Sequence, residues 1–289
     1  MRQGELAPAK VNLCLHVGPR RDDGYHPISS LIVFADVGDR LEAAPADNLT
    51  LEIEGPFAAD VPAGPDNLVL KAARAMLGED ARWAFRLQKD LPVGAGLGGG
   101  SADAAAAIRL LAPHLPHATI AKYDLRGLAA SLGSDVPACI AGRPVLAEGR
   151  GERLLPAPAM TPTPAVLVHP GEPCPTAAVY RAFDVRGGGE TDRPVLPASL
   201  ASPGDVAAFV KATRNDLEAP AIALVPAVGE VLAVLRAAPE ALAARMSGSG
   251  SACFAVCPDR DSADTLARRL AQDHPTWWVR ACRVGGPWR

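Results

Sequence analysis

Apolar and polar residues alternate along several short stretches of this chain, which is the pattern of a half-buried β-strand. The alternation is clearest over residues 6–17, where Val11, Leu13, Leu15 and Val17 point one way and the residues between them point the other. A longer apolar stretch, residues 28–43, predicts one or two strands. Further strands are predicted at residues 48–54, 83–88, 165–169, 253–256 and 277–284.

Other stretches carry apolar residues three and four positions apart, which is the spacing of one helical face. The alanine-rich stretch 102–111 has this spacing, and Pro113 and Pro116 end it. The predicted helices span residues 67–77, 102–111, 121–132, 176–183, 205–213, 227–237 and 262–273. Strands and helices mix in both halves without a strict strand–helix–strand repeat, so the sequence favours an α+β fold over a doubly wound α/β fold.

The clearest boundary in the chain is residues 156–164, which contain four prolines. Proline lacks a backbone N–H and cannot complete a helix or a strand ladder, so this segment is predicted to be a linker. The expected lobes are residues 1–155 and residues 165–289. The glycine- and proline-rich stretch 187–203 is predicted to be a mobile loop.

The composition fits one large or two ordinary domains, because 48% of the 289 residues are apolar. The net charge of −3 lacks the positive excess typical of nucleic-acid binding. No run of about 18 apolar residues predicts a membrane span, and the first residues lack the apolar centre of a signal peptide. The six cysteines are expected to be buried, reduced thiols. These features predict a cytoplasmic protein without a nucleic-acid or membrane partner.

The strongest chemical signal is a glycine-rich segment that leads directly into the helix predicted at 102–111. Five of the seven residues from 94 to 100 are glycines. Glycine permits a ligand to approach the backbone closely, and the first turn of a helix offers free N–H groups and the positive end of the helix dipole. The segment therefore predicts a site for a phosphate group.

Three templates for a phosphate loop compete here. The P-loop has a lysine after its last glycine, but Ser101 stands there instead. A dinucleotide-binding fingerprint fits glycines 94, 96 and 99, but the acidic residue that it needs about 20 positions further on is missing. The third template, Pro-x-x-x-Gly-Leu-Gly-Gly-Gly-Ser, fits Pro92 to Ser101 throughout. It resembles the ATP loop of the GHMP kinases, which act on galactose, homoserine, mevalonate and phosphomevalonate.

Three further motifs narrow the resemblance. They are Pro-Ala-Lys-x-Asn-Leu at 8–13, Asp-Gly-Tyr-His at 23–26 and Ser-Gly-Ser-Gly-Ser at 247–251. Together they resemble the GHMP kinases that phosphorylate the 2-hydroxyl of a cytidine-diphosphate-linked methylerythritol in the non-mevalonate isoprenoid pathway. The resemblance extends from about Ala7 to Phe254. It implies ATP and Mg²⁺, a ribosomal-protein-S5-like N-terminal lobe, a ferredoxin-like C-terminal lobe, and a substrate site between them.

Two charged residues are candidates for the phosphoryl-transfer chemistry. Lys10 is one of only five lysines, and it lies in a strand of otherwise apolar or small residues, where a charge needs a partner. Asp135 precedes a proline-marked turn, and on spacing alone it could equally be a helix cap. The resemblance makes Asp135 the catalytic base and pairs Lys10 with it and with the reacting hydroxyl. The alternative for Lys10 is a surface lysine at a strand edge.

The resemblance also implies the ligand-binding residues. Those expected at ATP are Pro92, Val93, Gly94, Ala95, Gly96, Leu97, Gly98, Gly99, Gly100, Ser101 and Ala102. Those expected at the small-molecule substrate are Asn12, Tyr25, His26, Thr176, Tyr180, Gly248, Ser249 and Gly250. Tyr25 and His26 also suit an unpaired cytosine by their chemistry, because an aromatic ring can stack on the base and an imidazole can hydrogen-bond with it.

One residue departs from the family pattern, and the sequence leaves the Mg²⁺ ligands and some alternative functions open. Many family members have a second serine where this chain has Ala102, so no hydroxyl is available there for Mg²⁺ or phosphate. No metal site is predicted, and Asp135 is the only acidic candidate for a Mg²⁺ ligand. Alternatives are a sister GHMP kinase, a non-catalytic nucleotide sensor and an NAD oxidoreductase. The protein is expected to act as a monomer or a homodimer.

Overall fold

The computed structural model describes residues 3–115, 125–190 and 192–288, and strands and helices occur in both halves, as predicted for an α+β fold. The strands are β1 (Gln3–Asn12), β2 (His16–Val17), β3 (Ile28–Pro45), β4 (Thr50–Glu54), β5 (Trp83–Gln88), β6 (Val145–Gly149), β7 (Arg153–Pro156), β8 (Ala159–Met160), β9 (Thr163–His169), β10 (Ser199–Leu200), β11 (Ala243–Met246), β12 (Cys253–Val256) and β13 (Trp278–Val284). The helices are α1 (Leu68–Leu77), α2 (Gly99–Leu111), α4 (Leu125–Leu132), α5 (Val136–Ala141), α6 (Thr176–Val185), α7 (Pro203–Ala212), α8 (Glu218–Leu224), α9 (Pro226–Ala237) and α10 (Arg260–Asp273), with 3₁₀ turns η1 (Ala58–Asp60) and η2 (Ala112–His114).

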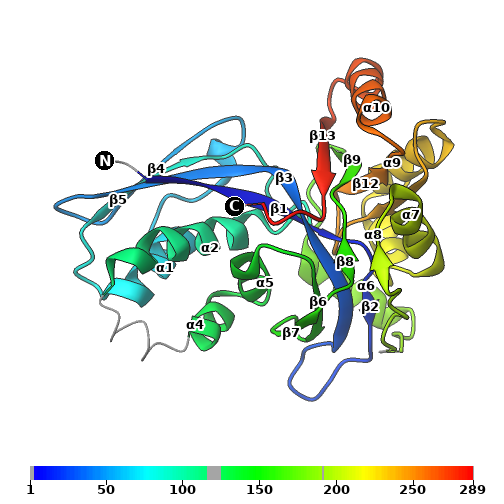
Figure 1. The fold of residues 1–289 in the computed structure, drawn as a ribbon. Helices are drawn as coiled ribbons and strands as arrows, with labels where there is room; N and C mark the ends of the chain where they lie inside the picture. The colour runs from blue at the N-terminus through cyan, green and yellow to red at the C-terminus, as the bar shows by residue number, and fades with distance from the viewer. Residues whose placement is uncertain (1–2, 116–124, 191, 289) are drawn as a thin grey trace.

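The long strand β3 connects the two halves of the molecule (Figure 1). It pairs antiparallel with β1, β2, β5 and β6, and its Ala35 pairs with Val284 of β13. The sheet therefore continues from β11 through β12, β9, β13, β3 and β5 to β4. The stretch predicted as one or two strands is a single strand, which Gly38 does not interrupt. A Cβ at Gly38 would lie 2.7 Å from the Cα of Pro8, so glycine is needed there for β1 to approach.

In the first half, helix α2 lies against β1 and β3, with α1 and α5 beside it (Figure 1). The buried face of α2 consists largely of alanines, whose small volume lets the helix approach the sheet closely. Phe34, Phe85 and Met76 belong to the same core. This packing fixes the start of α2 and therefore the glycine segment that precedes it.

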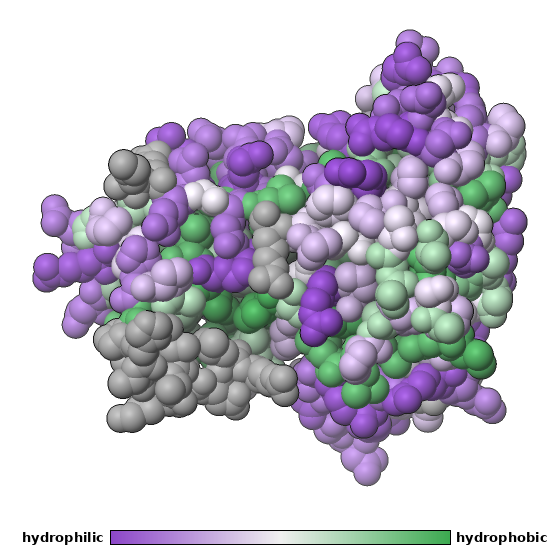
Figure 2. Space-filling model, viewed as in Figure 1, coloured by the Kyte–Doolittle hydropathy of each residue, from purple (hydrophilic) through white to green (hydrophobic). Residues whose placement is uncertain are grey.

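In the second half, β9 pairs antiparallel with β12 and β13. Val166 and Val168 of β9 share a core with α9 and α10, whereas Leu167 points to the opposite face and shares a core with α7, β1 and β3. Hydrophilic side chains cover the upper right of the molecule, where α10 lies (Figure 2). Each face of this part of the sheet is therefore covered by helices.

The structure differs from the sequence prediction mainly near prolines and glycines. Helix α2 begins at Gly99 rather than Ala102, so the last glycines form its first turn. The strand predicted over 6–17 is interrupted between Asn12 and His16, where the Leu15 N–H donates to the Arg214 carbonyl at 2.9 Å, and it resumes as β2, which pairs with β3 again. Residues 156–164 are not an irregular linker, since they contain β8 and the start of β9.

The sequence analysis did not predict several short elements, namely α5, α8, β6, β7, β8, β10 and β11. Helix α5 has Pro137 in its first turn, where the missing N–H costs nothing, so the proline taken to mark a turn instead lies at a helix start. Of the helix predicted over 121–132, Leu125–Leu132 is helical and residues 121–124 lie outside the described residues. All six cysteines are buried and free. Within the described part of the chain, no helix has the length and apolar content needed to cross a membrane.

Candidate active site

A cleft of about 900 Å³ collects most of the residues singled out from the sequence. Its lining includes Lys10, Asn12, Tyr25, His26, all ten residues from Pro92 to Ser101, Asp135, Thr176, Tyr180, Gly248 and Ser249. Ala102 and Gly250 are not part of this lining. Ala102 is fully buried in α2, and Gly250 is pressed against Met246, whose Sδ would lie 2.6 Å from a Cβ at that position.

The glycine segment follows a backbone path that other residues disfavour. Gly94, Gly96 and Gly98 have φ angles of 68°, 72° and 65°, in the left-handed region that glycine adopts without strain. Gly98 directly precedes α2, and no side chain caps the helix there. The first residues of α2 line the cleft. Their free N–H groups and the helix dipole therefore make this end of α2 a site for a phosphate group.

Hydrogen bonds hold the glycine segment between the two halves of the protein. From β1, the Lys10 N–H donates to the carbonyl of Leu97 at 2.8 Å. From the turn 247–251, Ser247 Oγ donates to the carbonyl of Gly96 at 3.1 Å. The segment is thus fixed by contacts on both sides, which preorganises its N–H groups.

The ammonium group of Lys10 lies between two partners in the cleft. Its Nζ donates to Asn12 Oδ1 at 2.8 Å and lies 3.2 Å from Asp135 Oδ2. The register between β1 and β3 shifts between Pro8 and Lys10, and such a bulge redirects the side chains that follow. Lys10 is only 5% exposed, so it is not a lysine at a surface strand edge. The structure therefore forms the Lys10–Asp135 pair that the resemblance implied.

Asp135 precedes the first residue of α5, but its side chain makes no capping hydrogen bond. The carboxylate is 35% exposed, lines the cleft and is held by Lys10. The cap interpretation therefore does not describe this side chain. A carboxylate that is held in place and still partly accessible can accept a proton from a bound hydroxyl.

Asn12 connects Lys10 to the surrounding strands. Its Nδ2 donates to Ser30 Oγ at 2.7 Å, and Ser30 Oγ donates to the carbonyl of Cys14 at 2.6 Å. The backbone N–H of Asn12 donates to Ser247 Oγ at 3.2 Å. These bonds fix the orientation of the amide, so that its oxygen faces Lys10.

Aromatic side chains gather in the same cleft around the loop that precedes β3. Tyr25 is 54% exposed, and the guanidinium of Arg150 lies 4.2 Å from the centroid of its ring. Nε2 of His26 lies 2.6 Å from Asp184 Oδ1, and its ring is 5.0 Å from that of Tyr180. Aromatic rings beside an oriented imidazole form a suitable site for a flat heteroaromatic ring.

Two hydroxyl groups meet where α6 begins. Thr176 Oγ1 lies 2.9 Å from Ser249 Oγ, which joins α6 to the turn 247–251. Asn215 Nδ2 donates to the carbonyl of Gly248 at 2.8 Å and holds that turn in place. Both hydroxyls line the cleft, so they are available to a ligand.

The sequence analysis missed a buried ionic cluster beneath the glycine segment. Lys89 Nζ donates to Asp39 Oδ2 at 2.5 Å and to Asp103 Oδ2 at 2.9 Å. Asp39 Oδ1 accepts hydrogen bonds from the N–H groups of Asp90 and Leu91 at 2.7 and 2.8 Å. Burial, partly opposed by the charge of Lys89, raises the pKa of Asp103 to about 7.

This cluster reaches the cleft, because Lys89 and Asp103 both belong to its lining. A Cβ at Gly99 would lie 2.9 Å from Lys89 Nζ, so the glycine allows the backbone to pass over the lysine. One signal in the sequence was available. Asp103 is the only acidic residue in this alanine-rich helix, and a buried carboxylate needs a partner.

The described residues contain no group of three or more His, Cys, Asp or Glu side chains that could hold a metal ion by themselves. Mg²⁺ commonly binds through one or two carboxylates together with waters and substrate phosphates, so it needs no such group. Asp135 provides a partly exposed carboxylate in the cleft, and Ser101 provides a hydroxyl. These donors fit a Mg²⁺ ion that arrives with a nucleotide.

The chain is similar to proteins of known family over nearly its whole length. Residues 67–143 match the GHMP kinases N terminal domain, and residues 196–276 match the GHMP kinases C terminal model. A relative from Caulobacter vibrioides, named 4-diphosphocytidyl-2-C-methyl-D-erythritol kinase, is 53% identical over 98% of this chain and 100% of its own length. A crystal structure of 4-(cytidine 5'-diphospho)-2C-methyl-D-erythritol kinase shares 37% identity with a TM-score of 0.78, covering 98% of this chain and 100% of that one.

A more distant structure shares the fold alone. Homoserine kinase from Cytophaga hutchinsonii is 18% identical, with a TM-score of 0.66 over 97% of this chain and 94% of its own. The predicted two-lobed GHMP kinase fold is therefore confirmed, and the oxidoreductase alternative is excluded. At 53% identity over almost the full length, the chain belongs to the 4-diphosphocytidyl-2-C-methyl-D-erythritol kinase family of the GHMP kinases.

Proposed function

We propose that this protein transfers the γ-phosphoryl group of ATP to the 2-hydroxyl of 4-diphosphocytidyl-2-C-methyl-D-erythritol, in the non-mevalonate route to isoprenoid precursors. The names of its relatives support this reaction. One observation carries the assignment of roles to residues. The Lys10–Asp135 pair lines the same cleft as the glycine segment and as Tyr25 and His26. One cleft thus offers a phosphate site, a base and a site for a nucleobase.

ATP would bind with its phosphates at the glycine segment, residues 92–101, and at the start of α2. Phosphoryl transfer depends mainly on positioning and on electrostatic stabilisation of the transferred group. The fixed N–H groups of this loop supply both. The start of α6 and the turn 247–251 would also contact the ligands, through the hydroxyls of Thr176 and Ser249 and the backbone of Gly248. Ala102 contributes no side-chain contact.

Asp135 would accept the proton of the 2-hydroxyl as the hydroxyl oxygen forms a bond to the γ-phosphorus and the bond to ADP breaks. Lys10 orients this carboxylate at 3.2 Å and brings a positive charge to the transferred group. Asn12 orients Lys10 in turn. The three residues would therefore act as one unit.

The cytidine end of the substrate would bind at Tyr25, His26 and Tyr180. The exposed ring of Tyr25 can stack on cytosine, and the imidazole of His26 can form a hydrogen bond with it. Asp184 holds that imidazole from α6. Tyr180, 5.0 Å from His26 between ring centroids, would form a second aromatic wall.

Mg²⁺ would accompany ATP, with Asp135 and Ser101 as the protein donors. When bound, the ion neutralises negative charge on the phosphates. The residues of the chain hold the nucleotide and move the proton.

We also propose the setting in which the enzyme works. Residues 1–155 and 165–289 would form the two lobes. The protein would act in the cytoplasm on a small molecule, as a monomer or a homodimer, without a nucleic-acid or membrane partner. The net charge of −3 supports the proposal that nucleic acid is not a partner.

The direct test is ADP release with ATP and Mg²⁺ against a panel of alcohols. The panel contains 4-diphosphocytidyl-2-C-methyl-D-erythritol, mevalonate, phosphomevalonate, homoserine and galactose, and ³¹P NMR identifies the new monoester. We expect release with the cytidyl compound alone. Release with another alcohol would overturn the cytosine site but keep the role of Asp135. ATP binding without release from any of them would favour a sensor.

A further inference from the structure

A second polar site lies on the strands beside the cleft. His16 of β2 pairs with Ser29 of β3, Ser29 pairs with Glu148 of β6, and Glu148 pairs with Arg153 of β7. Residues directly opposite each other on antiparallel strands place their side chains on the same face of the sheet. Four polar side chains therefore form a row across one face of four neighbouring strands.

This row borders a hollow of about 310 Å³. The polar residues that line it are Arg21, Ser29, Glu148, Arg153 and Arg193. Among the residues that the structure describes, Ile28 alone lines both this hollow and the active-site cleft. The hollow is therefore a neighbour of the cleft and not an extension of it.

The hollow carries an excess of positive charge, because three arginines face one glutamate. Arg193 Nε donates to Glu148 Oε1 at 2.6 Å, and Arg153 pairs with the other oxygen. The hydrogen bond from Arg193 holds the pKa of Glu148 below its usual range, so the carboxylate is ionised at neutral pH. A guanidinium has five N–H donors, and Glu148 engages one nitrogen of each partner. Donors on both arginines therefore remain for another anion.

Ser29 places a hydroxyl without a hydrogen-bond partner, among the described residues, in the lining of the hollow. It is 2% exposed, and its Oγ has no hydrogen-bond partner among the residues that the structure describes. Leaving a buried hydroxyl unpaired is costly, so such a group calls for an explanation. Its strand partner Glu148 lies on the same face, in the lining of the hollow. The position of Ser29 therefore suits a donor to a bound ligand.

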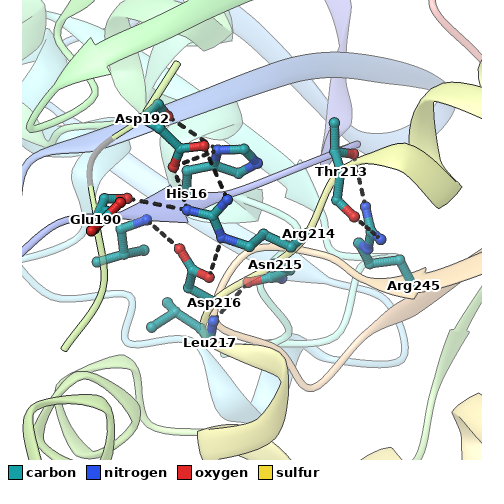
Figure 3. A network of polar contacts seen from close by, with 10 residues as sticks. His16, Glu190, Asp192, Thr213, Arg214, Asn215, Asp216, Leu217 and Arg245 are labelled. Atoms are coloured by element: carbon teal, nitrogen blue, oxygen red, sulfur yellow. Dashed lines mark hydrogen bonds and ion pairs between the residues drawn. The ribbon is translucent and has the colours of Figure 1, made fainter. Parts of the chain in front are cut away.

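A network of ion pairs holds the segment that presents Arg193 (Figure 3). Asp192, its neighbour in the chain, pairs with Arg214, and Asp192 Oδ1 lies 3.3 Å from His16 Nδ1. Arg214 Nε also donates to Asp216 Oδ1 at 2.7 Å. The hydrogen bond from Arg214 lowers the pKa of Asp192 to about 2, so this anchor stays charged. These contacts hold the segment in place and so position Arg193.

We propose that this hollow is a second ligand site, which binds a phosphate-bearing anion between Arg21, Arg153 and Arg193, with Ser29 Oγ as a further donor. Guanidinium groups match phosphate oxygens in charge and geometry. The site would not catalyse a reaction. Its existence does not depend on which alcohol the enzyme phosphorylates.

Isothermal titration calorimetry with the full chain tests the proposal. A non-hydrolysable ATP analogue at saturating concentration first fills the phosphate site of the active cleft. Inorganic phosphate or pyrophosphate is then titrated, and we expect one further site per chain. Binding of inorganic phosphate would identify free phosphate as a ligand source, whereas binding of pyrophosphate alone would indicate a diphosphate group. No binding of either probe would overturn the proposal.

Two variants locate the site. Arg153→Gln should weaken anion binding at least about tenfold, the usual scale for one charge-assisted hydrogen bond. Ser29→Ala should weaken it about tenfold without lowering the melting temperature, because the hydroxyl has no partner to lose. Both should keep the kinase turnover of the wild type, which reports separately on the active site. Arg86→Gln, in an exposed ion pair with Glu52, is the matched control and should bind anions normally.

Unchanged anion affinity in Arg153→Gln would overturn the site. Unchanged affinity in Ser29→Ala would overturn the part assigned to the hydroxyl. A loss of affinity of the same size in Arg86→Gln would show that the anion responds only to overall charge, and would also overturn the proposal.

Discussion

Lys10 and Asp135 come from opposite ends of the first half of the chain, and their charged groups lie 3.2 Å apart in the active-site cleft. Strand β1 carries the lysine, and the start of α5 carries the aspartate. Asn12 holds the lysine at 2.8 Å. The pair depends on the tertiary fold, but neither of its two side chains is part of an apolar core. Its removal should therefore affect chemistry more than folding.

Lys10→Ala should lower kcat roughly 10²- to 10⁴-fold, because the variant loses the charge that pairs with Asp135 and that we propose faces the transferred group. Asp135 is 35% exposed, so water can solvate it in the variant and the protein should still fold. ADP release measures turnover, and circular dichroism reports folding. Lys211→Ala, at the exposed end of α7, is the control and should behave as wild type. Near-normal turnover in a folded Lys10→Ala variant would contradict the catalytic role.

Tyr25→Ala should raise KM for the cytidyl substrate much more than KM for ATP. Stacking of a base on an aromatic ring contributes about 1–3 kcal/mol, which corresponds to a change of roughly five- to 150-fold. Tyr25→Phe retains the ring and should stay close to wild type. Steady-state kinetics with each substrate varied in turn measures both constants. An equal rise in the two KM values would argue against stacking on cytosine.

The sequence predicted the residues that line the cleft more completely than the residues that support them. Lys10, Tyr25 and the glycine segment lie in short motifs, so their chemistry can be interpreted locally. The cluster of Lys89 with two aspartates could not be found in this way, because its members come from β3, from the end of β5 and from α2. Local patterns report local structure, and only the paired strands bring such residues together.

Prolines caused a second kind of error. Pro137 was taken to mark a turn, but a proline fits the first turn of a helix, and α5 begins there. Pro164 was assigned to a linker, yet it lies in β9 opposite Arg283 of β13. Its carbonyl can still accept a hydrogen bond, and the Cys257 N–H donates to it at 2.9 Å. The effect of a proline thus depends on which of its backbone groups the neighbours require.

Asp184→Asn should weaken recognition of the cytidyl group without a comparable effect on turnover. Asp184 Oδ1 lies 2.6 Å from His26 Nε2 and fixes the imidazole. An amide would hold the ring less firmly, and we expect KM for the cytidyl substrate to rise about three- to tenfold with kcat within a factor of two. Asp273→Asn, at the end of α10, is the matched control. A fall in kcat at constant KM would place Asp184 in the chemical step instead.

Asp103 links the stability of the protein to pH. It shares Lys89 with Asp39 in a buried cluster, and burial is the main reason that its pKa rises to about 7. In the unfolded chain, an aspartate has a pKa of about 3.9. Between about pH 4 and pH 7, the folded state therefore keeps a proton that the unfolded state has released. The stabilisation that this proton provides is lost as the pH rises through the folded pKa.

The variant Asp103→Asn should remove this pH dependence, since an amide does not ionise but can still accept a hydrogen bond from Lys89. Between pH 5 and pH 8, the free energy of unfolding should change less in this variant than in the wild type. The difference between the two changes should be on the order of 1–3 kcal/mol. Asp39→Asn is the contrasting variant, because Asp39 also accepts the N–H groups of Asp90 and Leu91, and it should destabilise the protein by about 2–4 kcal/mol at every pH. Urea unfolding followed across this range measures both. A slope in Asp103→Asn as steep as that of the wild type would show that another group takes up the proton.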